Sequence, residues 1–218
     1  MTRDSRARSA WSCWALARRP CIISPMSPIT HLLAGWLVAN ASDRSNGRER
    51  AMIALSGVAP DVDGLGAVPD FLTRYSEHPL NLFSDYHHVL GHNIGFGLLL
   101  AIVVFAFATR RWTTAALSIL SFHLHLLCDL AGSRSPDGYQ WPIPYLLPFS
   151  DRLPLTWSGQ WELNAWPNFL VTGVALVILL ALAWKRGNSP LEMISASANS
   201  ALVGALRRRF PETTNQKR

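Results

Sequence analysis

The chain has 218 residues, of which 49% are hydrophobic and only 16% are charged, and it contains nine tryptophans. This composition argues against a wholly soluble globular domain and favours a membrane protein. The net charge of +6 does not indicate nucleic-acid binding, because the basic residues form short clusters beside apolar segments and are not interleaved with exposed aromatic side chains. The three cysteines form no CxxC pair, which argues against a disulfide framework or a thiolate metal site.

The first 25 residues are rich in arginine and contain only a short, interrupted apolar stretch. They therefore lack the apolar core of a convincing signal peptide. The segment that opens at Met26, MSPITHLLAGWLV, has the character of a protein's start. We expect residues 1–25 to be either the product of a wrongly assigned start codon or a disordered basic arm.

Two short apolar segments come next, at residues 29–40 and 51–59, and Pro60 closes the second. Both are helix candidates. Neither reaches the roughly 20 residues that a helix needs to cross a bilayer.

Three longer apolar segments follow. Two arginines separate residues 94–109 from residues 112–130, which predicts a tight hairpin of two membrane-length helices. Residues 166–184 carry no charge and have Trp at both ends, as expected for a span with aromatic residues at the two interfaces. The predicted fold is an all-α integral membrane protein, a helical bundle of about three full-length membrane helices plus two shorter apolar helices.

The remaining segments are less apolar. Residues 131–165 are rich in Pro, Gly and Trp and predict an ordered loop that could cover a site. Residues 187–218 predict a basic cytoplasmic tail with a weak surface helix near 191–206. Residues 26–186 are therefore expected to form the membrane-embedded domain.

Basic clusters lie at alternate ends of successive apolar segments, and the positive-inside rule places such clusters in the cytoplasm. The opposite ends of these segments must then share a non-cytoplasmic face. The clusters consist of Arg44, Arg48, Arg50, Arg110, Arg111, Lys185 and Arg186.

That opposite face is predicted to carry many of the chain's imidazoles and several carboxylates. Such groups are the usual ligands of zinc and similar divalent ions, and a metal supplies the partners that make their burial tolerable. The candidate metal ligands are His31, Asp61, His87, His88, His92, His125 and Asp129. Taken singly, His31 could equally be a packing or capping residue, and the acidic pair in PDVDG a common turn.

Spacing supports part of this set. His125 and Asp129 are four residues apart, so both side chains lie on one face of a helix. His123 is rotated away from them and is expected to face elsewhere.

The segment HHVLGH leaves two alternatives open. His88 and His92 would share a face if the segment were helical, whereas His87 and His92 would converge only if Gly91 breaks the helix. The sequence does not decide whether His87 or His88 is the ligand.

The motifs ITHLLAGWLVA, GVAPDVDG, HHVLGHN, HLHLLCD and PDGYQWPIP occur in this order. Over residues 27–184 they resemble the bacterial membrane-bound metal-dependent hydrolases of the YdjM-like family. The chain departs from the family pattern in two places. His88 stands where the family often has an Arg that could hold an anionic substrate, and Gly91 stands where it often has Thr. The resemblance implies the ligand set His31, Asp61, Asp63, His87, His92, His125 and Asp129.

The motif order is also similar to that of zinc-dependent phospholipase C and P1-type nucleases, which implies phosphoester hydrolysis. We therefore expect a multi-pass protein of the bacterial inner membrane, with membrane lipid as a partner and no nucleic acid. One or two divalent ions, with zinc the first choice, would activate water, and Asp63 or Asp61 would accept a proton. The substrate would be a phosphoester or a lipid headgroup. The alternative is a non-catalytic membrane scaffold with a structural or sensing metal site and a basic tail that docks a partner or anionic lipid.

Overall fold

The protein is described by a computed structural model that covers residues 28–135 and 138–211, so the expectations for residues 1–25 lie outside the described residues. The described chain is helical, and its only β-type pairing consists of the isolated bridges Arg134–Glu162 and Ile143–Leu155. Its elements are α2 (Pro28–Ala39), α3 (Gly47–Ser56), η2 (Ala59–Gly66), α4 (Ala67–Thr73), α5 (Leu82–Tyr86), α6 (Ile94–Phe107), α7 (Arg111–Gly132), α8 (Trp166–Arg186), η3 (Pro190–Met193) and α9 (Ala196–Arg209).

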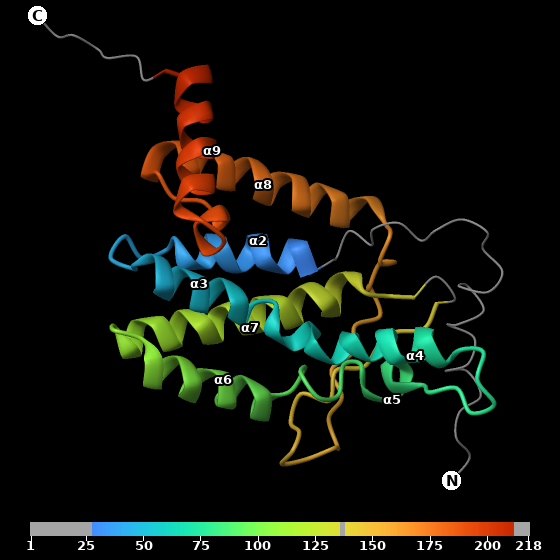
Figure 1. The fold of residues 1–218 in the computed structure, drawn as a ribbon. Helices are drawn as coiled ribbons and strands as arrows, with labels where there is room; N and C mark the ends of the chain where they lie inside the picture. Colours follow the sequence, from blue (N-terminus) through green and yellow to red (C-terminus); the bar gives the residue numbers. More distant parts are fainter. Residues whose placement is uncertain (1–27, 136–137, 212–218) are drawn as a thin grey trace, which may run out of the picture.

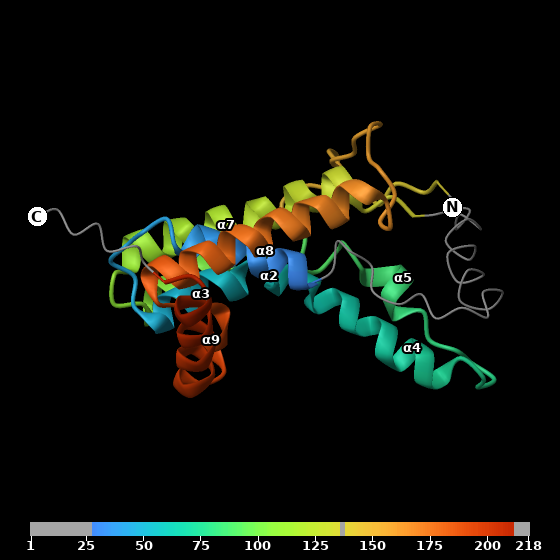
Figure 2. The same ribbon diagram turned by 90° about the horizontal axis from the view of Figure 1, so that it is seen from above.

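Five helices run alongside one another, and α7 lies among α2, α3 and α6, while α8 packs on α2 (Figure 1). Helices α4 and α5 project beyond the bundle at the end where α2 begins (Figure 2). The core includes the fully buried side chains of Trp36, Ile53 and Phe122. This architecture confirms the predicted all-α fold.

Helices α7 and α8 have 22 and 21 residues and are apolar and long enough to cross a membrane. Helix α6 is shorter than predicted, with 14 residues, because the side chain of Asn93 caps its start and the backbone is already extended at Ala108. A third candidate span consists of α3 and residues 59–73, which are long and apolar enough to cross a membrane only when taken together. The chain bends by 50° at the break between the two parts. Two to three candidate spans with shorter apolar helices agree with the predicted bundle.

Close backbone contacts hold α2, α3 and α7 together. A Cβ on Gly35 would lie 2.7 Å from Ser121 Oγ and 2.8 Å from the carbonyl oxygen of Ala54. A Cβ on Gly57 would lie 2.6 Å from the same Ser121 Oγ. Only glycine allows this approach, which brings the end of α3 against the middle of α7.

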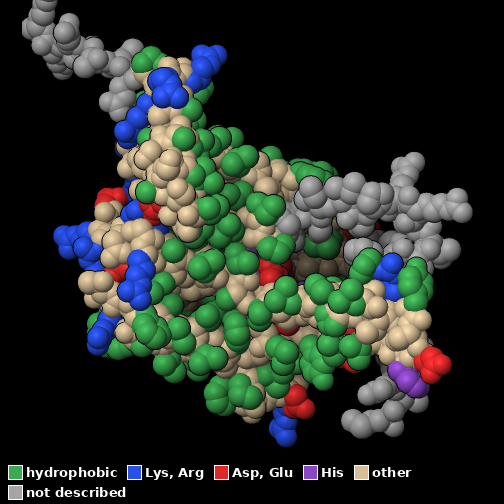
Figure 3. Space-filling model, viewed as in Figure 1, with side chains coloured by type: hydrophobic (Ala, Val, Ile, Leu, Met, Phe, Trp, Pro, Cys, Tyr) green, Lys and Arg blue, Asp and Glu red, His purple; other side chains and the backbone are tan. Residues whose placement is uncertain are grey.

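The basic clusters meet at the end of the bundle opposite to α4. Buried Glu49 accepts a hydrogen bond from the backbone N–H of Arg110 at 2.7 Å and so joins the α6–α7 turn to α3. Arg186, at the end of α8, pairs with Asp43 at 2.7 Å. Most of the Lys and Arg side chains on the face shown in Figure 3 lie at this end and on α9. The structure thus brings the basic clusters to one end of the bundle, as predicted.

The C-terminal region contains the predicted surface helix, although its bounds differ from those expected. The short helix η3 comes first, and α9 then extends to Arg209, beyond the expected end near residue 206. Glu192 of η3 forms a two-pronged ion pair with Arg50 of α3, at 2.7 and 2.9 Å, which anchors this region to the bundle.

Candidate metal centre

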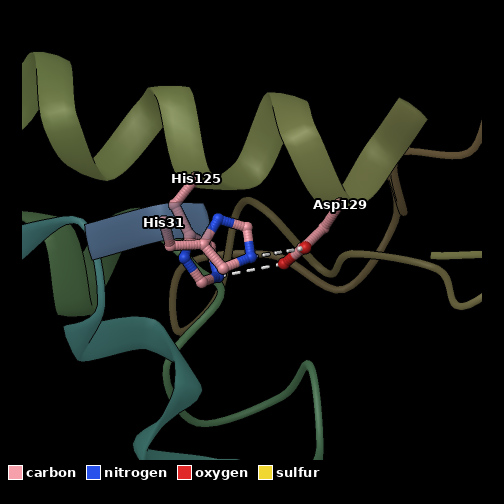
Figure 4. Close-up of side chains that lie close together, drawn as sticks. All are labelled: His31, His125 and Asp129. Carbon is pink, nitrogen blue, oxygen red and sulfur yellow. Dashed lines mark ion pairs between the residues drawn. The ribbon is translucent and has the colours of Figure 1, made fainter. Parts of the chain in front are cut away.

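The predicted ligands come from four separate parts of the chain and meet at the end of the bundle where α2 begins. Helix α2 supplies His31, η2 supplies Asp61, and α7 supplies His125 and Asp129. The segment between α5 and α6 supplies His88 and His92. Figure 4 shows His31 and His125 pointing toward Asp129 from two helices.

The carboxylate of Asp129 is the centre of the cluster. Its Oδ1 lies 3.2 Å from Nε2 of His31. Its Oδ2 lies 2.9 Å from Nε2 of His125, 3.1 Å from Nε2 of His92 and 3.9 Å from Nε2 of His88. All five side chains are buried. The same nitrogen of four imidazoles therefore faces one carboxylate.

Hydrogen bonds on the far side of two rings determine which nitrogen is free. Nδ1 of His125 lies 2.7 Å from the carbonyl oxygen of Gly57, which can only accept, so Nδ1 carries the hydrogen. Nδ1 of His92 lies 3.0 Å from Oδ2 of Asp63 and donates to it. In their neutral forms both rings therefore present a bare Nε2 to the centre, as in metal-ligating histidines oriented by a carbonyl or carboxylate.

Asp63 lies behind the cluster rather than in it. Its Oδ1 accepts from Nδ1 of His87 at 3.0 Å. Its Oδ2 accepts from His92 and, at 3.2 Å, from the backbone N–H of Gly91. Both oxygens are thus occupied in holding the 87–92 segment.

Other polar atoms in the cluster have no hydrogen-bond partner. Oδ2 of Asp61 is buried and unpaired, and Oδ1 of this residue lies 3.8 Å from Nε2 of His125. Nδ1 of His31 and Nδ1 of His88 are also buried without a partner. Unpaired buried polar atoms are costly, and a cation or water among them would relieve that cost.

The geometry distinguishes the two adjacent histidines. His88 adopts a φ of +64°, a left-handed conformation uncommon outside glycine, and its buried ring faces Asp129. His87 stacks on Phe83 with ring centroids 4.3 Å apart and packs edge-on against Trp141. The structure thus brings His88 into the cluster and leaves His87 beside it.

Three overlapping groups have ligand atoms within 4.8 Å of one another and could hold a metal ion. His92, His125 and Asp129 each belong to two of these groups. Nitrogen and carboxylate oxygen in groups of three are typical of zinc and related ions. The residues present therefore fit a divalent ion, and the overlap accommodates one ion or two. The groups are His31 with His125 and Asp129, Asp61 with His92 and His125, and His88 with His92 and Asp129.

Comparison with known families places the chain in a membrane-protein family. The family model described as YdjM inner membrane protein matches residues 26–209. The chain belongs to the YdjM family. No curated protein and no solved structure gives a significant match.

In this YdjM family member, the surroundings shift the pKa values of His88 and His92 in opposite directions. Burial lowers the pKa of His88 well below its ordinary value, and the neighbouring rings of His87 and His92 act in the same direction. Burial also disfavours a charged His92, but hydrogen bonds to Asp129 and Asp63 outweigh it and raise the pKa of His92 to about 9. His88 is thus a neutral ligand candidate, whereas His92 holds a proton that an incoming cation would displace.

The 131–165 segment contributes residues that the ligand pattern did not identify. The buried amide of Gln160 donates to the backbone oxygen of Asp129 at 2.8 Å and to Ser133 Oγ at 3.1 Å, and so fixes the end of α7. No sequence signal marks a glutamine in an irregular loop for this role. Trp141 packs against His87 and His88, in line with the expectation that this loop could cover the site.

Other residues of the motifs lie apart from the cluster. His123 hydrogen-bonds the Ile119 carbonyl and the Tyr145 hydroxyl, both at 2.8 Å, which agrees with its predicted outward orientation. The indole of Trp161 donates to Asn168 at 2.6 Å and so braces the start of α8.

Proposed function

We propose that this protein is an inner-membrane hydrolase that holds one or two divalent ions, with zinc the first choice, in the His/Asp cluster. The observation that carries the proposal is the convergence of four imidazole Nε2 atoms on Asp129 while Nδ1 of His92 and Nδ1 of His125 are engaged elsewhere. Such an arrangement gives bare nitrogen lone pairs beside a carboxylate, which is the donor set of a metal centre.

The residues divide into holding and proton-accepting roles. The ion would be held by His31, His88, His92, His125 and Asp129. A bound divalent ion supplies a lowered pKa for water and polarisation of the bond to be cleaved. Asp61 is the better candidate for the proton acceptor, because its Oδ2 has no partner and its side chain is 20% exposed. Asp63 is the weaker one, since both its oxygens already accept hydrogen bonds.

The surroundings of the cluster favour an amphipathic substrate. Exposed apolar side chains continue from η2 along α4, including Leu65, Val68, Leu72 and Tyr75. Their spacing places several of them on one side of the segment that η2 and α4 form. A phosphoester of a lipid headgroup would place its apolar part on this surface and its polar part near Asp61.

The distribution of charge supports a position of the site on the non-cytoplasmic side. The basic clusters lie at the end of the bundle where α7 begins (Figures 1 and 3), and Asp129 is near the other end of this helix. Positively charged loops are retained in the cytoplasm. The site would then face the periplasmic side of the inner membrane.

The alternative role is a structural or sensing metal site in a membrane scaffold. The deep burial of His31, His92 and His125, which are at most 2% exposed, favours this alternative, because a structural site leaves no coordination position open. The partial exposure of Asp61 favours the hydrolase.

Two measurements test the proposal. Metal content of the purified protein is compared with that of the double variant His125→Ala with Asp129→Ala and of Asp129→Asn. The matched control is Asp151→Asn, because Asp151 is an exposed carboxylate. We expect metal in the wild type and the control and its loss in both site variants. Equal metal content in all four proteins contradicts the proposal.

A phosphodiesterase and esterase screen in detergent then separates the two roles. We expect wild-type activity that Asp61→Asn lowers without equal loss of metal. Metal that is retained without activity in the screen supports the scaffold.

A further inference from the structure

A second feature lies at the other end of the bundle, where α8 and α9 meet. Their side chains form an open hollow of about 320 Å³, lined by Leu180, Ala181, Trp184, Leu206 and Phe210. This volume lies within the range of ligand sites, about 300–1,000 Å³. The hollow shares no residue with the metal centre, because its lining comes from α8, α9 and Phe210.

Positive charge surrounds this hollow. Helix α8 ends in Lys185 and Arg186, and α9 ends in three consecutive arginines, Arg207 to Arg209. Arg186 is paired with Asp43, and the guanidinium of Arg207 donates to the backbone oxygen of Trp184. Among the described residues, no carboxylate forms an ion pair with Lys185 or with the three arginines of α9.

The orientation of α9 places this combination at a membrane surface. Helix α8 is long enough to span, and α9 runs across its direction in both views (Figures 1 and 2). The indole N–H of Trp184 donates to the backbone oxygen of Phe210 at 2.7 Å, which fixes the end of α9 against α8. Trp at the end of a span and a crossing helix with a basic end are typical of the interface region.

We propose that the hollow between α8 and α9 binds an acyl chain of an anionic phospholipid whose phosphate contacts the arginines of α9 and Lys185. Charge complementarity identifies the occupant, because the apolar floor and a basic rim without carboxylate partners match the two parts of such a lipid. Residues 212–218 of the chain, ETTNQKR, contain no apolar side chain and do not supply a matching occupant. The inference does not depend on the proposed hydrolase activity.

Native mass spectrometry of the full chain in detergent tests this inference. The probes are phosphatidylglycerol and phosphatidylcholine with the same acyl chains. Three variants are compared with the wild type: Ala181→Phe, the pair Arg208→Gln with Arg209→Gln, and the control pair Arg44→Gln with Arg48→Gln. Ala181 is exposed in the hollow, so its enlargement fills the hollow without disturbing the core. Arg44 and Arg48 are exposed at the same end of the bundle but do not line the hollow.

We expect the wild type to retain phosphatidylglycerol in preference to phosphatidylcholine. Each basic residue near an anionic lipid strengthens binding about fivefold, so the loss of two should weaken it about 25-fold. Ala181→Phe should remove retention of both lipids, and the control pair should change it much less. Helix content by circular dichroism, measured in every variant, reports that the bundle is folded.

Equal retention of the two lipids by the wild type overturns the proposal. So does retention that Ala181→Phe leaves unchanged, or a loss in the control pair as large as in the α9 pair, which would indicate general charge attraction.

Discussion

Nε2 of His92 and Nε2 of His125 lie 3.0 Å apart, although Nδ1 of each ring already donates to an acceptor of its own. Two neutral rings held in this way would direct lone pairs at each other. A proton or a metal ion between them removes that repulsion. The two rings could therefore hold a proton or a metal ion between them.

This relationship predicts that metal affinity depends on pH. The pKa of His92 is raised from 6.5 to about 9, so the folded, metal-free protein holds this proton more tightly than the unfolded chain. The resulting stabilisation is fully present below pH 6.5 and is lost as pH rises through about 9. A divalent ion must displace the proton, so its affinity should rise about tenfold per pH unit up to about pH 9 and then level off. Competition titrations with a chelating dye measure this slope, and a flat profile across that range would contradict the assignment.

Replacement of Asp63 should weaken metal binding without abolishing it. In Asp63→Asn, an amide cannot accept from His87, His92 and the Gly91 N–H together, so the ring of His92 loses its fixed orientation. Loss of such an orienting partner lowers metal affinity by about 10–100-fold. Zinc competition titrations measure the change, with the exposed carboxylate variant Asp85→Asn as control. A loss as complete as that in Asp129→Asn would make Asp63 a direct ligand.

The 87–92 segment lies close against η2 at Gly91, so we predict that this position does not tolerate a larger residue. A Cβ on Gly91 would overlap the carbonyl oxygen of Pro60, so Gly91→Ala must push the 87–92 segment away from η2. We expect loss of metal while the helix content by circular dichroism stays near the wild-type value. Gly173→Ala is the control, since a Cβ there meets nothing within 4 Å. Full metal occupancy in Gly91→Ala would show that the loops can separate without harm.

The orientation in the membrane can be tested by cysteine labelling. Ser158, in the loop beside the proposed metal centre, and Ser200, on α9, are both exposed. In a background without the three native cysteines, Ser158→Cys should react with a membrane-impermeant reagent in intact cells. Ser200→Cys should react only after the membrane is opened. The reverse pattern would place the metal centre in the cytoplasm.

Regular helices were predictable from the sequence, and irregular segments were not. The long apolar segments at α7 and α8 and the four-residue spacing of His125 and Asp129 follow helical periodicity, which the structure keeps. The choice between His87 and His88 depends on the left-handed backbone of His88. No periodicity applies in such a segment, so the choice could not be made from spacing.

Tertiary contacts explain the other differences. The short apolar segment was expected to end at Pro60, but α3 already ends at Ser56. The chain continues as η2 and α4, and only their packing shows the 50° bend. Gln160 acts through a backbone oxygen of α7, and contacts of this kind leave no mark in a composition or a motif.

The ligands His31 to Asp129 are delivered by α2, η2, the 87–92 segment and α7, and none of them comes from α8. During synthesis the last of these residues emerges before α8 does. The first part of the bundle can therefore assemble every residue of the proposed metal centre before α8 docks through contacts such as Thr30 with Thr172.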